Sequence, residues 1–191
     1  MKTRFQERTI RKRQTARITQ PKFKGGKGLQ VEKSVTINRS PEELWSYWRR
    51  FENLPRFMIH LQSVTEREDG TSHWVMKTDR GKELEWDARL IEARPNEMIS
   101  WQSLENADVD SAGSVWFTPA AGGRGTVVRV KMRYNPPGGK LGAALAKITG
   151  QSAEKQIDED LDRFKALMET GEIPTNEGRP RGAKERISRV G

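Results

Sequence analysis

The chain of 191 residues contains no cysteine and only two histidines. Without thiols it has no disulfide, no thiolate nucleophile and no cysteine-ligated zinc, a composition that fits a reducing compartment. The histidines, His60 and His73, are far apart in the sequence, and neither has a partner at the spacing of metal ligands. We therefore expect a domain without metal or cofactor, because about 150 residues bury enough surface to fold without either.

Long apolar runs and nucleotide-binding motifs are also missing. No apolar run approaches the roughly 18 residues of a membrane span, and the N-terminus lacks the apolar core of a secretory signal. There is no nucleophile elbow, P-loop or dinucleotide fingerprint, and the glycine-rich stretch 122–125 is better explained as a hairpin turn. We expect a cytoplasmic protein with at most a peripheral association with membranes.

The net charge of +9 is concentrated in the two ends of the chain. Residues 1–29 hold ten Lys or Arg against one Glu, and residues 175–191 hold five against two Glu. Between them, residues 30–174 hold 20 basic and 23 acidic side chains. The basic character therefore belongs to the tails.

Both tails are polar and poor in apolar residues, so we expect disordered basic arms at 1–28 and 174–191 on either side of a domain at 29–173. An arm of this kind is a solvated extension, a polybasic contact to RNA, a ribosome or anionic lipid, or a transit peptide. The transit-peptide interpretation lacks a sustained apolar helical face. The candidate contacts with an anionic partner are Arg11, Lys12, Arg13 and Arg17.

The central domain begins with an alternating segment, Leu29–Asn38, which predicts a strand. Ser40-Pro41-Glu42-Glu43 then forms a capping box with proline at the first helical position. The helix that follows has an aromatic face that includes Trp45 and Trp48. Asn53-Leu54-Pro55 is expected to end it and to cap a second short helical turn at 56–58.

Six further strand patterns follow, separated by short turns, and together they predict a seven-stranded antiparallel sheet. Alternation gives the sheet one apolar face and one charged face, most clearly in Glu83–Ala93 and Thr126–Tyr134. The predicted strands are Leu61–Arg67, Ser72–Thr78, Glu83–Ala93, Glu97–Ser103, Gly113–Thr118 and Thr126–Tyr134.

The C-terminal part is helical and is predicted in two pieces, with a hinge at Gly150. The first piece, Lys140–Thr149, is rich in small residues, and we expect it to move when a ligand enters. Ser152 is placed to cap the second piece, which Gly171 ends. The second piece carries an apolar stripe that we expect to cover the sheet: Ile157, Leu161, Phe164 and Met168.

Six tryptophans, against two tyrosines, favour a pocket for an extended or ring-containing apolar ligand. Trp86 and Trp101 fall on apolar strand faces, so the pocket is expected between sheet and helix. Its expected lining is Trp45, Phe57, Met58, Trp74, Trp86, Trp101, Phe117, Met132, Tyr134, Leu141, Leu145, Ile148, Ile157 and Leu161.

Few groups in this pocket are candidates for acid–base chemistry. His60 and Tyr134 stand at element ends and are the candidate polar groups of the cavity. The carboxylates Glu83, Glu85 and Asp87 alternate on the strand face opposite Trp86, so they are expected to face water. We therefore expect no inward carboxylate and assign no catalytic residue.

Four segments resemble the polyketide cyclase/dehydrase and lipid-transport family of the START-like (SRPBCC) superfamily, near its coenzyme Q-binding branch. These segments are 40–45, 54–61, 85–88 and 134–139, within a likeness that covers about residues 30–173. The resemblance implies an α+β helix-grip, Bet v 1-like fold with a cavity between sheet and terminal helix. Access to it would lie between 57–59 and the residues Leu141, Leu145 and Ile148.

The leading hypothesis is non-enzymatic binding or transport of a hydrophobic small molecule such as a lipid, an isoprenoid or a quinone. Two alternatives remain open at this point. One is RNA or ribosome binding through the basic arms, and the other is a polyketide-type aromatase/cyclase. The sequence leaves the oligomeric state open.

Overall fold

The structure is a computed structural model that describes residues 29–77, 81, 83–105, 107, 109–135 and 150–173. These residues form a seven-stranded antiparallel sheet in the order β1-β7-β6-β5-β4-β3-β2. The strands are β1 (Leu29–Ile37), β2 (Leu61–Glu66), β3 (Thr71–Lys77), β4 (Glu83–Arg94), β5 (Met98–Ser103), β6 (Asp110–Pro119) and β7 (Thr126–Asn135). The helices are α1 (Pro41–Arg49), α3 (Gly150–Thr170) and the 3-10 helices η1 (Phe51–Arg56) and η2 (Ala121–Gly123). The predicted α+β helix-grip fold is confirmed.

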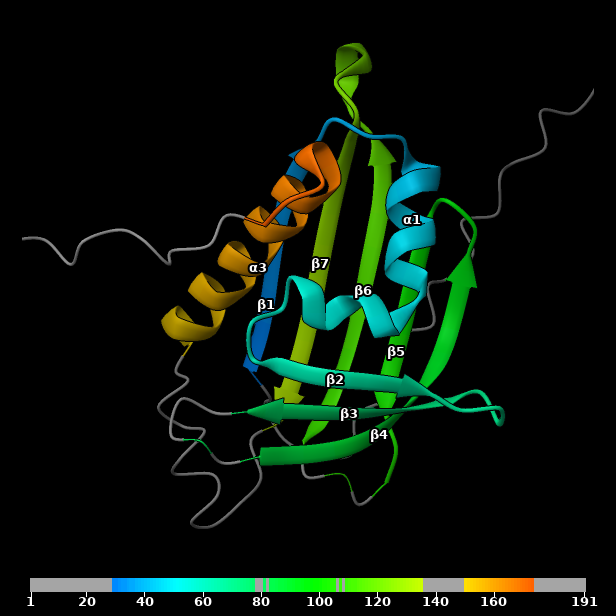
Figure 1. The fold of residues 1–191 in the computed structure, drawn as a ribbon, viewed down its shortest axis with the longest axis vertical. Coiled ribbons are helices and arrows are strands. Elements are labelled where there is room, and N and C mark those ends of the chain that lie inside the picture. Colours follow the sequence, from blue (N-terminus) through cyan, green and yellow to red (C-terminus); the bar gives the residue numbers. More distant parts are fainter. Residues whose placement is uncertain are drawn as a thin grey trace, which may run out of the picture.

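The sheet is strongly curved, and all the longer helices lie on its inner side. Figure 1 shows β2, β3 and β4 running across the ends of β5, β6 and β7, while α3 lies over β1 and α1 lies over β5 and β6. The register shifts in β4 between Leu90 and Glu92, and such an irregularity bends a strand. The bend turns the part of the sheet that β2 and β3 form toward α3.

Alternation along the strands gives the two faces the predicted character. On β4, Leu84 and Ala88 are buried, while Glu83 and Glu85 are exposed. On β7, Val128 and Val130 are fully buried. Because successive side chains of a strand point to opposite faces, the buried set forms one continuous apolar floor.

The capping box at the start of α1 is present as predicted. The Glu43 N–H donates to Ser40 Oγ at 3.2 Å, and the Ser40 N–H donates to Glu43 Oε2 at 3.0 Å. The expected end of the helix is wrong, because α1 already stops at Arg49 and residues 53–55 lie inside η1. Arg50 takes an extended conformation, and the Asn53 side chain donates to the Tyr47 carbonyl at 2.9 Å, satisfying the end of α1 from the next helix.

The last helix differs from the prediction at its start and agrees at its end. α3 begins at Gly150, so Ser152 lies inside the first turn rather than at the cap. The first turn leaves backbone N–H groups free in any helix, so a serine there is tolerated. Gly171 has a φ of 80°, and its N–H donates to the Leu167 carbonyl at 2.8 Å, as a C′ glycine does. The predicted piece 140–149 lies outside the described residues.

Polar bonds fix α3 along the edge strand β1. Lys33 forms an ion pair with Asp158 at 2.9 Å, and Lys165 Nζ donates to the Thr36 carbonyl at 2.6 Å. Inside this seam the predicted stripe is buried at Leu161 and Phe164. Within the described ranges, no helix is long and apolar enough to cross a membrane.

Candidate functional site

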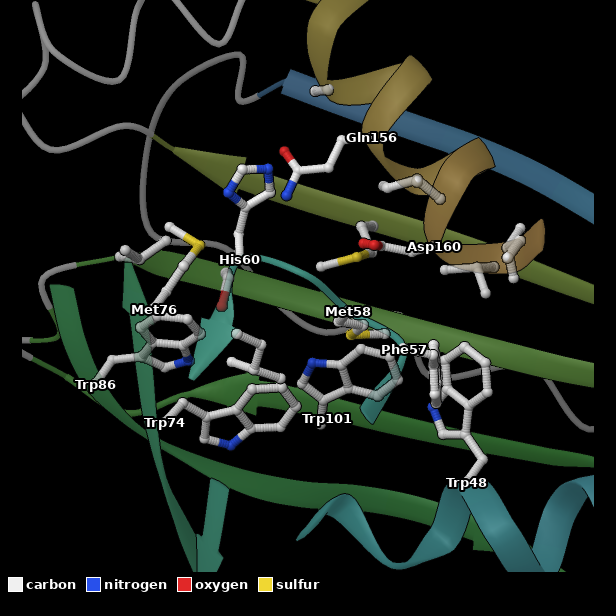
Figure 2. A pocket seen from close by; sticks show the side chains of 18 residues that line it. Trp48, Phe57, Met58, His60, Trp74, Met76, Trp86, Trp101, Gln156 and Asp160 are labelled. Carbon is white, nitrogen blue, oxygen red and sulfur yellow. The ribbon is translucent and has the colours of Figure 1, made fainter. Parts of the chain in front are cut away.

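A cavity of about 150 Å³ lies between the curved sheet and α3. Figure 2 shows its lining, with Trp74, Trp86 and Trp101 on the sheet side and Gln156 and Asp160 on the side of α3. Of the 18 described residues that line it, four are polar, and these are His60, Ser111, Gln156 and Asp160. A mostly apolar cavity with a few polar groups is the usual form of a small-molecule site.

Three nearly parallel indole rings form the sheet side of the cavity. Trp74 lies 5.8 Å from Trp86 with planes 22° apart, and 6.2 Å from Trp101 with planes 15° apart. Trp74 and Trp86 are cross-strand partners on β3 and β4, which brings their rings together. Phe51 packs against Trp74 and Trp101 from behind at 5.4 and 5.8 Å and holds the group in place.

The position of Trp101 depends on a glycine in the neighbouring strand. Gly113 of β6 is its register partner, and a Cβ built on Gly113 would overlap the six-membered ring of Trp101. The missing side chain therefore lets the indole lie flat across β6. Glycine within a strand often marks such a close approach.

Three methionines, Met58, Met76 and Met132, complete much of the remaining wall. Their unbranched thioether side chains change rotamer easily and contact aromatic rings favourably. The part of the wall that the methionines form can therefore adjust its shape.

Among the described residues that line the cavity, one is acidic, and this is Asp160. Its side chain is 11% exposed. Its Oδ1 accepts from the Ile59 N–H at 3.3 Å and from Arg163 Nη2 at 2.5 Å. Arg163 Nε in turn donates to the Phe57 carbonyl at 2.9 Å. No described residue donates to Oδ2, and Figure 2 shows the carboxyl group directed into the cavity.

Burial raises the pKa of Asp160, while Arg163, the Ile59 N–H and His60 act in the lowering direction. His60 and Gln156, both half-buried, lie close to one another at one end of the cavity in Figure 2. Their neighbour Ile59 is 66% exposed, so this end faces the surface.

The structure brings most of the predicted lining residues together. Those that line the cavity are Phe57, Met58, His60, Trp74, Trp86, Trp101, Met132, Ile157 and Leu161. Two lie elsewhere: Trp45 turns toward the start of β5 and donates to the Met98 carbonyl at 3.3 Å, and Phe117 is buried behind Trp48. Leu44 and Trp48, four residues apart, take the buried face of α1, which leaves Trp45 beside it.

Other predicted residues lie outside the part of the chain that is described. These are Leu141, Leu145, Ile148, the side chain of Tyr134, and the arm residues Arg11, Lys12, Arg13 and Arg17. Their assignments stay predictions.

The expectation of no inward carboxylate is wrong, because Asp160 points into the cavity. It stands three residues after Ile157 and four before Phe164, and residues at these spacings share a helix face. An acidic residue inside an apolar stripe was the signal that could have found it. His73, in contrast, lies on the outer face of β3, with its Nδ1 2.8 Å from Asp87 Oδ1.

Known proteins with the same architecture place this chain in a family. The chain is 34% identical to a protein of Deinococcus radiodurans of known crystal structure, over 75% of this chain and 98% of that one, with a TM-score of 0.61. It is 28% identical to an uncharacterized 17.2 kDa protein of Streptomyces lincolnensis, over 73% of this chain and 89% of the relative.

A third similarity concerns the fold alone. The di-domain ARO/CYC StfQ from the steffimycin biosynthetic pathway is 15% identical, with a TM-score of 0.53 over 72% of this chain and 49% of that protein. The family model for polyketide cyclase/dehydrase and lipid transport matches residues 37–162, which include α1, all of β2 to β7 and more than half of α3. This chain therefore belongs to the polyketide cyclase/dehydrase and lipid transport family of the SRPBCC superfamily.

Proposed function

We propose that the protein binds a small hydrophobic molecule with a flat ring in the cavity between the sheet and α3, and does not convert it chemically. The observation that carries this proposal is the wall of three parallel indoles, Trp74, Trp86 and Trp101. Flat aromatic walls favour flat apolar ligands, because ring-to-ring contact adds about 0.5–1.5 kcal/mol beyond the burial of area.

The volume limits how much of a ligand this cavity encloses. Engineered protein cavities of about 150 Å³ bind benzene, so a cavity of this size holds a single ring. A larger ligand would enter with one ring or chain end and displace the methionine side chains. The head group of a quinone, which the likeness to the coenzyme Q-binding branch suggests, or the end of an isoprenoid or lipid would fit this description.

The expected affinity for an isolated ring is modest. Burying roughly 150 Å² of apolar ligand surface at about 25 cal/mol per Å² contributes about 4 kcal/mol, which corresponds to a dissociation constant on the order of 1 mM. Physiological ligands with more surface would bind more tightly. Fragment experiments therefore need millimolar concentrations.

Two measurements test the proposal. Native mass spectrometry and solvent extraction of purified protein should reveal a copurifying hydrophobic compound, and ring compounds should change the tryptophan fluorescence. Trp101→Leu should weaken binding of the ring compound. Trp116→Leu is the matched control, because Trp116 is half-buried on the outer face beneath Arg129 at 4.5 Å. Absence of any bound compound together with no fluorescence response would refute the proposal.

An enzyme acting on a polyketide-like substrate is the second candidate, favoured by the presence of both His60 and Asp160 at the cavity. It predicts that a ring-forming substrate recovered after incubation has lost water, more slowly with Asp160→Asn. Recovery of unchanged compound at every time point would favour the binding protein.

A further inference from the structure

We propose that the cavity selects a neutral ring compound bearing one hydroxyl group, and that Oδ2 of Asp160 accepts the hydrogen bond from that hydroxyl. The inference rests on the proposed function and deepens it by naming the ligand class. It follows from how the two oxygens of Asp160 are used, from the charges around them and from the ring-sized space beside them.

The two oxygens of Asp160 have different environments. Oδ1 is occupied by two donors, the Ile59 N–H and Arg163 Nη2. Oδ2 has no donor among the described residues, although the side chain is 89% removed from solvent. Oδ2 borders the open space of the cavity, where water can bond to it. A ligand that displaces this water without supplying a donor loses a hydrogen bond, so a ligand that supplies a donor is favoured.

The surrounding charges select against ionised ligands. Arg163 already compensates Asp160, so an ammonium ligand would bring an additional positive charge into an apolar cavity. A carboxylate ligand such as a fatty acid would place a second negative charge beside Asp160. Among the described lining residues the other titratable side chain is His60. A neutral donor is the remaining class.

The carboxylate is held in position before any ligand arrives. The Ile59 N–H and the Arg163 bond to the Phe57 carbonyl tie α3 to the segment between η1 and β2. Because the acceptor is already ordered, the free energy of ligand binding includes no cost for ordering it. Across the cavity, the three indoles offer their surface to the ring that carries the hydroxyl.

Four single-ring probes of similar size separate these properties by calorimetry at pH 7.5. Toluene offers no hydrogen bond, phenol offers a donor, benzonitrile offers only an acceptor, and benzoate offers a negative charge. We expect phenol to bind on the order of tenfold more tightly than benzonitrile, as a bond to a charged acceptor implies. Phenol should also bind more tightly than toluene, and benzoate should not bind.

Asp160→Asn should change the order of the probes. The amide oxygen must take the place of Oδ1, where two N–H groups point, so the amide NH₂ takes the place of Oδ2. The variant then presents a donor to the cavity. The affinity for benzonitrile relative to that for phenol should therefore rise at least severalfold. Asp162→Asn makes the same change on the exposed face of α3 and should preserve the original order.

The outcomes distinguish this inference from the proposed function. If wild-type protein binds toluene, phenol and benzonitrile equally, or binds benzoate best, the inference fails while ring binding stands. If no probe binds, the proposed function fails and the inference fails with it. Retained toluene binding shows that the cavity of Asp160→Asn is intact, and if that variant does not fold, the wild-type series alone decides.

Discussion

Trp101 of β5 lies flat against Gly113 of β6, and the space between the ring and the backbone leaves no room for a Cβ. The contact links the order of the sheet to the shape of the cavity, because Trp101 is one of the three parallel indoles.

Gly113→Ala should therefore destabilise the protein and displace the indole. Overpacking of this kind typically costs about 1–3 kcal/mol, measured as the free energy of unfolding in denaturant. The affinity of the cavity for ring compounds should fall at the same time. Thr118→Ala, at an exposed position of the same strand, should change stability by only about 0.5 kcal/mol. Equal stability of the two variants would show that Trp101 moves aside freely.

Phe164→Ala should be among the most destabilising changes in α3. Phe164 is fully buried, with its ring 4.7 Å from Phe57 and 5.0 Å from Trp48. Removing a buried phenylalanine costs about 3–5 kcal/mol, because the surrounding residues close the space only in part. Chemical denaturation against the exposed Asp162→Ala measures it, and a loss below about 1 kcal/mol would contradict the packing of these rings.

The buried carboxyl of Asp160 should give a distinct pH dependence to stability. Burial raises the pKa of this carboxyl in the folded protein above its ordinary value of 3.8, while Arg163 and the Ile59 N–H act in the lowering direction. The folded protein thus holds this proton more strongly than the unfolded chain, so its contribution to stability is full below pH 3.8 and is lost as pH rises through the folded pKa.

Asp160→Asn cannot titrate at this position, which makes it the reference for that measurement. Thermal unfolding from pH 3 to pH 7 should show wild-type protein losing stability relative to Asp160→Asn as the pH rises. If the difference in stability between the two proteins is constant with pH, or changes in the opposite direction, burial does not dominate the pKa of Asp160.

Deletion of residues 1–28 tests the predicted role of the basic arm. It removes ten Lys or Arg and one Glu. If the arm binds RNA through 6–10 phosphate contacts, affinity should fall by about 10³ to 10⁵ between 50 and 200 mM salt and be lost in the deletion. Binding to anionic and neutral vesicles separates a lipid surface from RNA. Ring binding should be unchanged, and association that persists without residues 1–28 would assign it to another part of the chain.

Much of the fold could be predicted because its signals are local. The capping box needs only Ser40 and Glu43, and the C′ glycine needs only Gly171 and the turn before it. Alternation along β4 and β7 assigned the buried and exposed faces without knowledge of the neighbouring strands. In these cases the interacting groups lie within a few residues of one another.

The candidate site depended on contacts between residues far apart in the chain. The alternation placed Trp86 and Trp101 inside, but their parallel arrangement required the register of β3 to β6 and the absence of a side chain at Gly113. The end of α1 was misplaced because the group that satisfies it, Asn53, belongs to the following helix.

By itself, the sequence determined a curved antiparallel sheet with a tryptophan-rich inner face and a long helix to cover it. Only the tertiary structure decided that Asp160 is inside, because its orientation depends on how α3 is rotated over β1 and on the donors of Ile59 and Arg163. Propensity and periodicity describe one element at a time. The environment of a buried charge is set by every element that packs around it.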